Sequence, residues 1–201
     1  MSRRRVALTF DAEHPSRSNC PPANIDGILD ALDSSAVRAA FFVQGRWATA
    51  YPDVARRIAS GHRIGNHSNH HAPMTRLTDE GIAEDIREAE ERIRSVTGAD
   101  PRPWFRCPFG LGQDDPRVIS AASSLGYRMA RWDVDGRDWD EGRTAGSLGD
   151  DVIRDVVKHG DGAVVLLHSW PEPTRQALPD IIEALRGEGF GFVTFDEVAD
   201  G

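Results

Sequence analysis

Short apolar runs alternate with longer amphipathic stretches along the chain. The runs at 6–10, 39–43 and 163–167 are strongly apolar and end at polar residues, which is typical of buried strands. The amphipathic stretch that starts at Thr78 has isoleucines at roughly helical spacing up to Gly98, and its Thr-Asp-Glu-Gly start predicts a capped helix. Further helices are expected at 25–32, 52–60, 116–125, 147–158 and 174–186, and further extended segments at 62–65, 104–105, 127–132 and 192–194.

This alternation of strands and helices predicts parallel strands joined by crossover helices. Such a chain forms either an α/β barrel or an open doubly wound sheet, and the pattern alone leaves both open. No glycine-rich phosphate loop follows the first strand, which disfavours nucleotide-binding folds. The length of 201 residues, without a long linker or a low-complexity tract, predicts a single domain over residues 1–201.

The composition is that of an ordinary globular protein, with 39% hydrophobic and 28% charged residues. The net charge of −8 disfavours nucleic acid or an anionic membrane as the main partner, because phosphate groups would be repelled. Cys20 and Cys107 are too few for a disulfide framework. The basic start is followed by an apolar stretch that stops at Asp11, too short for a signal peptide or a membrane span, so a cytoplasmic location is expected.

Ionisable residues follow the predicted strands, where the loops of a parallel α/β fold gather the chemistry. His67 and His71 are four residues apart, so on one helical turn they would converge on a single cation, whereas a solvated histidine-rich loop is the other interpretation. Asp11 and Glu13 are two residues apart on a strand and point to the same side, although Asp11 in a turn-capping role is an alternative. Two histidines and one carboxylate form a facial triad with open positions, which suits metal-assisted hydrolysis.

Two residues at later strand ends also have two interpretations each. His168 directly follows an apolar run, so it is either a buried core residue or a general acid that titrates near neutral pH. Arg106 is either a surface charge or a buried partner of an anion, which Asp11 or Asp138 would supply.

The remaining candidates are aromatic side chains and a thiol. Trp139 and Trp170 follow polar loop residues at strand ends, where they either pack in the core or stack on sugars. Cys107 has no histidine beside it in sequence and precedes Pro108, which disfavours it as a nucleophile. The absence of a GxSxG motif disfavours a serine hydrolase.

Five short motifs occur in order across nearly the whole chain: Thr9-Phe10-Asp11, His67-Ser68-Asn69-His70-His71, Arg106-Cys107-Pro108-Phe109-Gly110, Asp135-Gly136-Arg137-Asp138-Trp139 and Leu166-Leu167-His168. Together they resemble those of the polysaccharide deacetylase family, the carbohydrate esterases built around the NodB homology domain. Each motif is weak alone, but their order and strand-sized gaps make the combination specific. The resemblance implies an α/β fold, a distorted (β/α) barrel with mostly parallel strands.

The resemblance also assigns roles to residues of the first three motifs. His67 and His71 would bind a divalent transition metal, zinc before cobalt, nickel or manganese. Asp11 would be the general base that deprotonates the attacking water, and Arg106 would orient Asp11. These roles are those of a metal-dependent hydrolase.

The resemblance assigns further residues to the leaving group and to the acetyl group. His168 would be the general acid, tuned by a charged hydrogen bond from Asp138. Trp139 and Leu166 would form an apolar slot for the acetyl methyl. The backbone N–H of Phe109 would stabilise the oxyanion, a contribution of typically about 3 kcal/mol for one such donor.

The sequence departs from the family at one metal position. The family has a second aspartate as a metal ligand where this chain has Ala12. Glu13 is the expected substitute, because it shares the face of Asp11 and some relatives space the two carboxylates in this way.

The sequence therefore predicts a metal-dependent deacetylase that removes acetyl groups, N-acetyl first, from an acetylated oligosaccharide or amino-sugar conjugate. One alternative is a metal-independent C–N hydrolase of the same superfamily, imidase-like or allantoinase-like, that acts on a cyclic amide or ureide. The other is a non-catalytic sugar-binding relative that uses Trp139 and Trp170.

Overall fold

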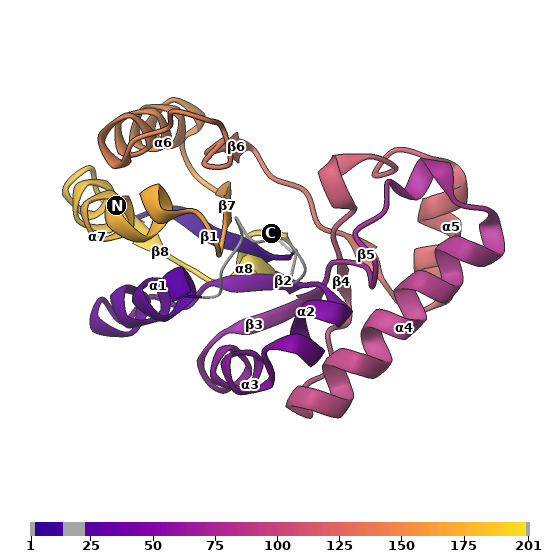
Figure 1. The fold of residues 1–201 in the computed structure, drawn as a ribbon. Coiled ribbons are helices and arrows are strands. Elements are labelled where there is room, and N and C mark those ends of the chain that lie inside the picture. Colours follow the sequence, from indigo (N-terminus) through magenta and orange to yellow (C-terminus); the bar gives the residue numbers. More distant parts are fainter. Residues whose placement is uncertain (1–2, 14–22, 200–201) are drawn as a thin grey trace. The chain divides into compact units, whose positions relative to one another are not determined.

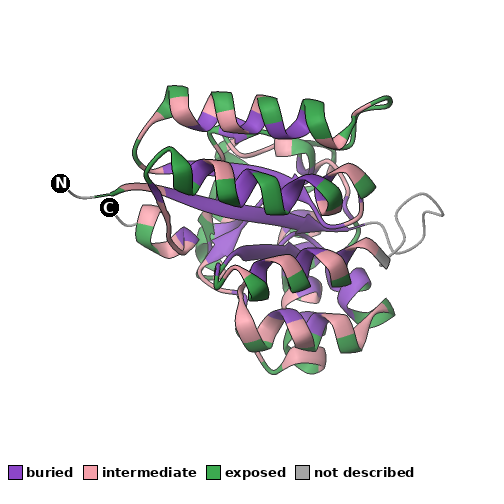
Figure 2. Ribbon diagram, turned by 90° about the vertical axis from the view of Figure 1, so that its left-hand side faces the viewer, coloured by how far each residue is buried: buried purple, intermediate pink, exposed green. Residues whose placement is uncertain are grey.

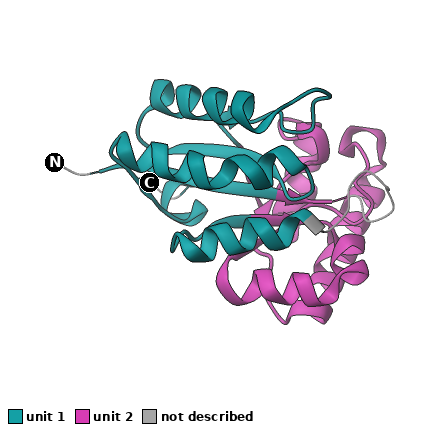
Figure 3. Ribbon diagram, turned by 60° about the vertical axis from the view of Figure 1, so that its left-hand side comes forward, with its two compact units in different colours: residues 1–10, 18–40, 132–201 teal, residues 11–17, 41–131 magenta. Residues whose placement is uncertain are grey.

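Residues 3–13 and 23–199 are described by the structure, which is a computed structural model (Figure 1). The chain forms two compact units, coloured separately in Figure 3. Unit 1 comprises residues 1–10, 18–40 and 132–201, and unit 2 comprises residues 11–17 and 41–131. The single domain over residues 1–201 stays a prediction. Cys20 lies outside the described residues.

Unit 1 is built around the long strand β1, whose last two residues belong to unit 2. β7 lies between β1 and β6, and β8 pairs in parallel with the start of β1. β6 and β7 also run parallel, with Val134 opposite Val165. The strands are β1 (Arg4–Ala12), β6 (Val134–Asp135), β7 (Ala163–His168) and β8 (Phe190–Phe192), and the helices are α1 (Ala23–Ser34), α6 (Ala145–His159), α7 (Glu172–Gly187) and α8 (Phe195–Ala199).

Unit 2 has its strands in the order β5-β4-β3-β2. β3, β4 and β5 run parallel, and Asn66 at the end of β3 lies opposite Phe105 in β4. The strands are β2 (Ala40–Val43), β3 (Arg63–Asn66), β4 (Trp104–Phe105) and β5 (Arg128–Met129). The helices are α2 (Gly45–Ala50), α3 (Pro52–Gly61), α4 (Asp79–Thr97) and α5 (Pro116–Ser124), with short 3₁₀ turns η1 (Met74–Arg76) and η2 (Pro108–Gly110).

Helix α4 shows how the local sequence sets an element. The Thr78 hydroxyl accepts a hydrogen bond from the Gly81 N–H, and Gly98 ends the helix with φ of 72°, a conformation that glycine adopts without steric cost. Ile82, Ile86 and Ile93 form its buried stripe. Ile82 and Ile86 belong to a core of unit 2 that also contains Met74, Phe105, Cys107, Val118, Ala122 and Tyr127.

The burial pattern follows the strand and helix periodicities. β7 is buried at all six positions and β2 at all four, as the continuous apolar runs in the sequence predict. Figure 2 shows helices that are buried along one side and exposed along the other, which is the pattern of amphipathic helices. None of the helices in the part of the chain that the structure describes is long and apolar enough to cross a membrane.

Most predicted elements are confirmed within a few residues, but two predicted strands differ. The strand at 127–132 is reduced to β5, because the Tyr127 N–H bonds back to the Ala122 carbonyl at the end of α5. The strand at 192–194 is wrong: β8 ends at Phe192, and Thr194 donates two hydrogen bonds to the Glu197 carboxylate at the start of α8. The two-residue strand β6 and the short helices α2 and α8 were not predicted, since their length gives little periodic signal.

Candidate functional site

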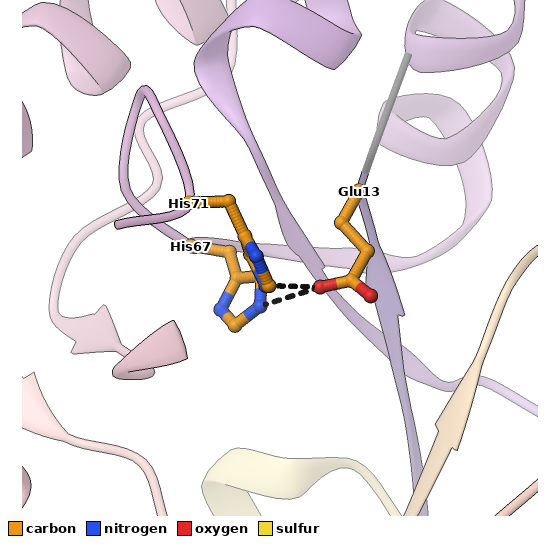
Figure 4. A group of neighbouring side chains, drawn as sticks. All are labelled: Glu13, His67 and His71. Carbon is orange, nitrogen blue, oxygen red and sulfur yellow. Dashed lines mark ion pairs between the residues drawn. The ribbon is translucent and has the colours of Figure 1, made fainter. Parts of the chain in front are cut away.

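Three buried side chains of unit 2 converge on one point. Glu13, His67 and His71 each offer a ligand atom, and these atoms lie within 4.8 Å of one another. In Figure 4 one carboxylate oxygen of Glu13 faces both imidazole rings. Glu13 follows the end of β1, and the histidines follow β3. The three residues thus come together at the carboxyl ends of two strands of the fold, where the sequence predicted the chemistry.

His67 is fixed by two backbone carbonyl groups. Its N–H donates to Val43 (3.1 Å), and its ring Nδ1 lies 2.9 Å from the carbonyl oxygen of Arg106. A carbonyl only accepts hydrogen bonds, so in the neutral ring Nδ1 carries the hydrogen and Nε2 has the lone pair. Nε2 points to two carboxylates, at 3.4 Å from Glu13 Oε2 and 3.5 Å from Asp11 Oδ2.

The pair does not lie on a helical turn, and this part of the prediction is wrong. Ser68 and His71 both have positive φ, 65° and 56°, so the intervening loop leaves the helical region. The loop is closed by side chains: the Ser68 N–H donates to Asn66 Oδ1 (2.9 Å), and the His71 N–H donates to Ser68 Oγ (3.0 Å). His71 Nε2 thereby lies in close contact with Glu13 Oε2.

A buried ion pair lies beside the three residues. Arg106 is fully buried, and its Nη1 donates to Asp11 Oδ1 at 2.8 Å. The guanidinium also lies over the ring of Phe42, 3.9 Å from its centroid. Of the two partners that the sequence left open for Arg106, the structure places Asp11 against it.

The arrangement fits a cation. Burial acts to lower the pKa of the His67 imidazole, but the charges of Asp11 and Glu13 outweigh it, and the pKa lies above its ordinary value. His67 Nε2 is buried and makes no hydrogen bond to a described residue. Two carboxylates therefore face Nε2 of His67, and a divalent ion with nitrogen and oxygen ligands would balance their charge.

Phe109 and Cys107, in the third motif, differ in exposure. Phe109 has φ of 58° and a side chain that is 58% exposed, and its ring contacts that of His71 with centroids 4.5 Å apart. Cys107 is buried, and burial raises the pKa of its thiol to about 12. A thiol that stays protonated at neutral pH is a poor nucleophile, which agrees with the prediction that Cys107 has no such role.

Unit 1 holds a separate histidine–carboxylate pair. His168, the last residue of β7, has its Nδ1 2.7 Å from Asp138 Oδ1, and its backbone N–H donates to Asp138 Oδ2 at 2.7 Å. The Thr174 hydroxyl, at the start of α7, donates to the same Oδ2. Thr174 is fully buried and was not singled out in the sequence, although a buried threonine in the first turn of a helix has a hydroxyl that needs a partner.

The other predicted substrate residues of unit 1 lie in different environments. The Trp170 ring is 5.9 Å from that of His168, and the Trp170 carbonyl accepts a hydrogen bond from Asn24. Trp139 is 50% exposed, and Leu166 is buried in β7. The structure thus places Trp170 beside His168 and leaves Trp139 on the surface.

Comparisons with known proteins show the family of this chain. The sequence model of the family described as polysaccharide deacetylase matches residues 1–130. The peptidoglycan-N-acetylglucosamine deacetylase PgdA of Listeria monocytogenes is 32% identical over 196 residues, which is 97% of this chain and 39% of that protein. The chain thus spans about two fifths of the length of this relative.

Two solved structures have the same fold. The structure of T48 deacetylase with substrate has a TM-score of 0.84 and 29% sequence identity, and the match covers 99% of this chain and 92% of that one. The structure of BA3943 from Bacillus anthracis, a pseudoenzyme of carbohydrate esterase family 4, has a TM-score of 0.86 and 27% identity over 98% of this chain and 65% of that one. The predicted fold class, a distorted (β/α) barrel of the NodB type, is therefore confirmed. Because the family model matches more than half of this chain, the chain belongs to the polysaccharide deacetylase family.

Proposed function

We propose that this protein is a metal-dependent deacetylase that hydrolyses the N-acetyl group of an acetylated amino sugar. The observation that carries the proposal is the convergence of Glu13, His67 and His71 next to the ion pair of Asp11 and Arg106. The relative from Listeria monocytogenes is named for the removal of acetyl groups from N-acetylglucosamine in peptidoglycan. The similarity to a pseudoenzyme shows that the fold alone does not establish activity, so the argument rests on the side chains.

Glu13, His67 and His71 would hold the metal through one carboxylate oxygen and two imidazole nitrogens. This set of hard and borderline ligands suits zinc, and cobalt, nickel or manganese also accept it. A bound divalent ion would polarise the acetyl carbonyl and make water a stronger acid at neutral pH. Three protein ligands leave coordination positions open, as in other hydrolytic sites.

Asp11 would act as the general base. Arg106 holds Oδ1 of its carboxylate at 2.8 Å, which leaves Oδ2 to take a proton from the attacking water. This charged hydrogen bond from the fully buried guanidinium also keeps the carboxylate in one orientation. The backbone N–H of Phe109 would stabilise the oxyanion of the acetyl group as it forms.

His168 would act as the general acid toward the leaving amine. Because Asp138 Oδ1 accepts from Nδ1–H, the second ring nitrogen, Nε2, is where a proton would be held and given up. Leu166 and Trp139 would line an apolar slot for the acetyl methyl, and Trp170, beside His168, would contact the sugar.

The test measures acetate release by the purified protein from N-acetylglucosamine oligomers. Chelation should abolish release, and zinc, cobalt, nickel or manganese should restore it, one of them best. Substituting the exposed Glu183 by Gln provides a matched control that should leave metal content and rate unchanged.

Other results would contradict the proposal. Activity on cyclic imides that survives chelation would indicate a metal-independent C–N hydrolase instead. Binding of the oligomers without acetate release, with every metal tried, would indicate a sugar-binding protein without activity.

A further inference from the structure

The loop that contains His71 is held by hydrogen bonds from the start of α2 and from α4. Between the two histidines the chain runs through Ser68, Asn69 and His70, and their backbone groups need partners, because the first two are fully buried. The Ser68 carbonyl accepts from the Gly45 N–H (3.0 Å), and the Asn69 carbonyl accepts from the Gln44 side chain (3.0 Å). These contacts satisfy the carbonyl groups of Ser68 and Asn69.

The two N–H groups directly before His71 have one common acceptor. The Asn69 N–H donates to Asp85 Oδ2 at 2.9 Å, and the His70 N–H donates to Asp85 Oδ1 at 3.1 Å. Each carboxylate oxygen thus receives one backbone N–H of the loop. Asp85 is buried, at 5% exposure, on the apolar stripe of α4 between Ile82 and Ile86.

We propose that Asp85 is a positioning residue for the metal centre. Its carboxylate fixes the two peptide units before His71 and so sets the distance of His71 Nε2 from Glu13 and His67 Nε2. Hydrogen bonds from N–H groups to an ionised carboxylate are roughly twice as strong as those between neutral groups, so this contact can hold a loop with two left-handed residues. The inference rests on the proposed function, because it requires that the three residues bind a metal.

The electrostatics of α4 argue against a role in folding stability alone. Burial raises the pKa of Asp85, and the two N–H groups of the loop offset only part of this effect. An ionised carboxylate at this position therefore costs free energy of folding at neutral pH. A buried carboxylate that is costly to ionise but holds a ligand loop departs from the usual burial pattern, as residues at functional sites often do.

The test is a cobalt titration of the metal-free protein, followed by visible absorbance, in the wild type and in Asp85→Asn. An asparagine keeps the shape and one acceptor oxygen, but its amide group faces the second backbone N–H with another donor. We expect cobalt affinity to fall by about 10-fold to 100-fold, the usual effect of residues that hold metal ligands, and the cobalt spectrum to change. Unchanged affinity with an unchanged spectrum would overturn the proposal.

Two control variants separate positioning from charge and from stability. Glu84→Gln removes the same charge from the exposed side of the same helical turn, and Ile93→Val weakens the buried stripe of α4 away from the loop. Both should bind cobalt within about 2-fold of the wild type, since neither touches a group that holds a metal ligand. A fall in affinity in Ile93→Val as large as in Asp85→Asn would show that α4 acts through stability, and would overturn the proposal.

Hydrogen exchange on the wild type covers the case in which Asp85→Asn does not fold. Because loop order and metal affinity are linked, zinc should slow exchange of the Asn69 and His70 amides more than that of amides at the far end of α4. If zinc leaves the exchange rates of these two amides unchanged, the proposal is overturned. A wild type that binds no metal would overturn it together with the proposed function, whereas a wild type and Asp85→Asn that bind metal equally would overturn this inference alone.

Discussion

The two histidine sites of this protein differ in how their charges are balanced. In unit 1, Asp138 accepts hydrogen bonds from the His168 ring, the His168 backbone and the Thr174 hydroxyl, so its carboxylate is satisfied by hydrogens alone. In unit 2, Glu13 Oε2 faces Nε2 of both histidines, and the Nδ1–H of His67 donates to the carbonyl of Arg106. Under the proposed function, the same residue types would form a proton-holding pair in one unit and a cation site in the other.

The number of hydrogen-bond donors that face the carboxylates distinguishes a proton-holding pair from a cation site. A carboxylate with several N–H and O–H donors needs no further positive charge, whereas two carboxylates facing ring lone pairs do. The raised pKa of His67, set by Asp11 and Glu13 against the effect of burial, shows the same demand for positive charge. We therefore expect metal affinity to depend on unit 2 alone and proton transfer to depend on both sites.

Removing Glu13 should give the largest effect. In Glu13→Ala the cation site loses its carboxylate ligand, and we expect metal affinity to fall by more than the roughly 100-fold seen for residues that only support ligands. Acetate release should be lost with it. Metal affinity is measured by competition with a chromophoric chelator. A variant that keeps wild-type affinity would show that Asp11, whose Oδ2 is 3.5 Å from His67 Nε2, is the carboxylate ligand.

Asp11→Asn should separate catalysis from metal binding. An amide cannot take a proton from water, so kcat should fall by about 10²-fold to 10⁴-fold, the usual contribution of a general base. Metal content, measured by atomic emission, should stay at the wild-type level. Loss of both together would reassign Asp11 from base to ligand.

Removing a hydrogen-bond donor to Asp138 should lower kcat without changing the metal affinity. Thr174→Val keeps the side-chain shape but removes one donor, and we expect kcat to fall by about 10-fold, less than for loss of a proton-transfer group. Thr174→Ser keeps the hydroxyl and should recover most of the rate. Metal affinity should be unchanged in both variants, and a fall in affinity would contradict the division between the two sites.

Some features of the two histidine sites could be predicted from the sequence. The strand-end positions of Asp11, His67 and His168 followed from apolar runs that stop at polar residues. The left-handed conformation of Ser68 and His71 did not, because it depends on contacts from α2 and α4 that no short pattern records. The two histidines converge as the motif indicated, but from a loop instead of a helical turn.

Other features had a signal that was not used. Asp85 interrupts the isoleucine stripe of α4, and a charge on a buried face needs a partner. Its partners are backbone N–H groups, which every residue carries, so the sequence could point to Asp85 but not to the loop it holds. The Thr194 and Glu197 pair likewise has the spacing of a helix start, and it explains why the last predicted strand was wrong.

The smallest predicted effect concerns the pH dependence of stability in unit 2. Because burial raises the pKa of Asp85 in the folded state, the folded protein binds this proton more readily than the unfolded one. The stability that this group contributes is therefore full below its unfolded pKa and is lost as the pH rises through its folded pKa. Asp85→Asn has no such loss, so its unfolding free energy relative to the wild type should rise between pH 4 and pH 7, by about 1.4 kcal/mol for each unit by which the pKa is raised. Urea unfolding of both proteins at the two pH values measures this difference, in which titrating groups that do not interact with Asp85 cancel; His70, which lowers the pKa of Asp85, and Glu88, which raises it, do interact with it. A relative stability that falls over this range would mean that the loop N–H groups outweigh burial, and that α4 holds the metal loop at no cost to the fold.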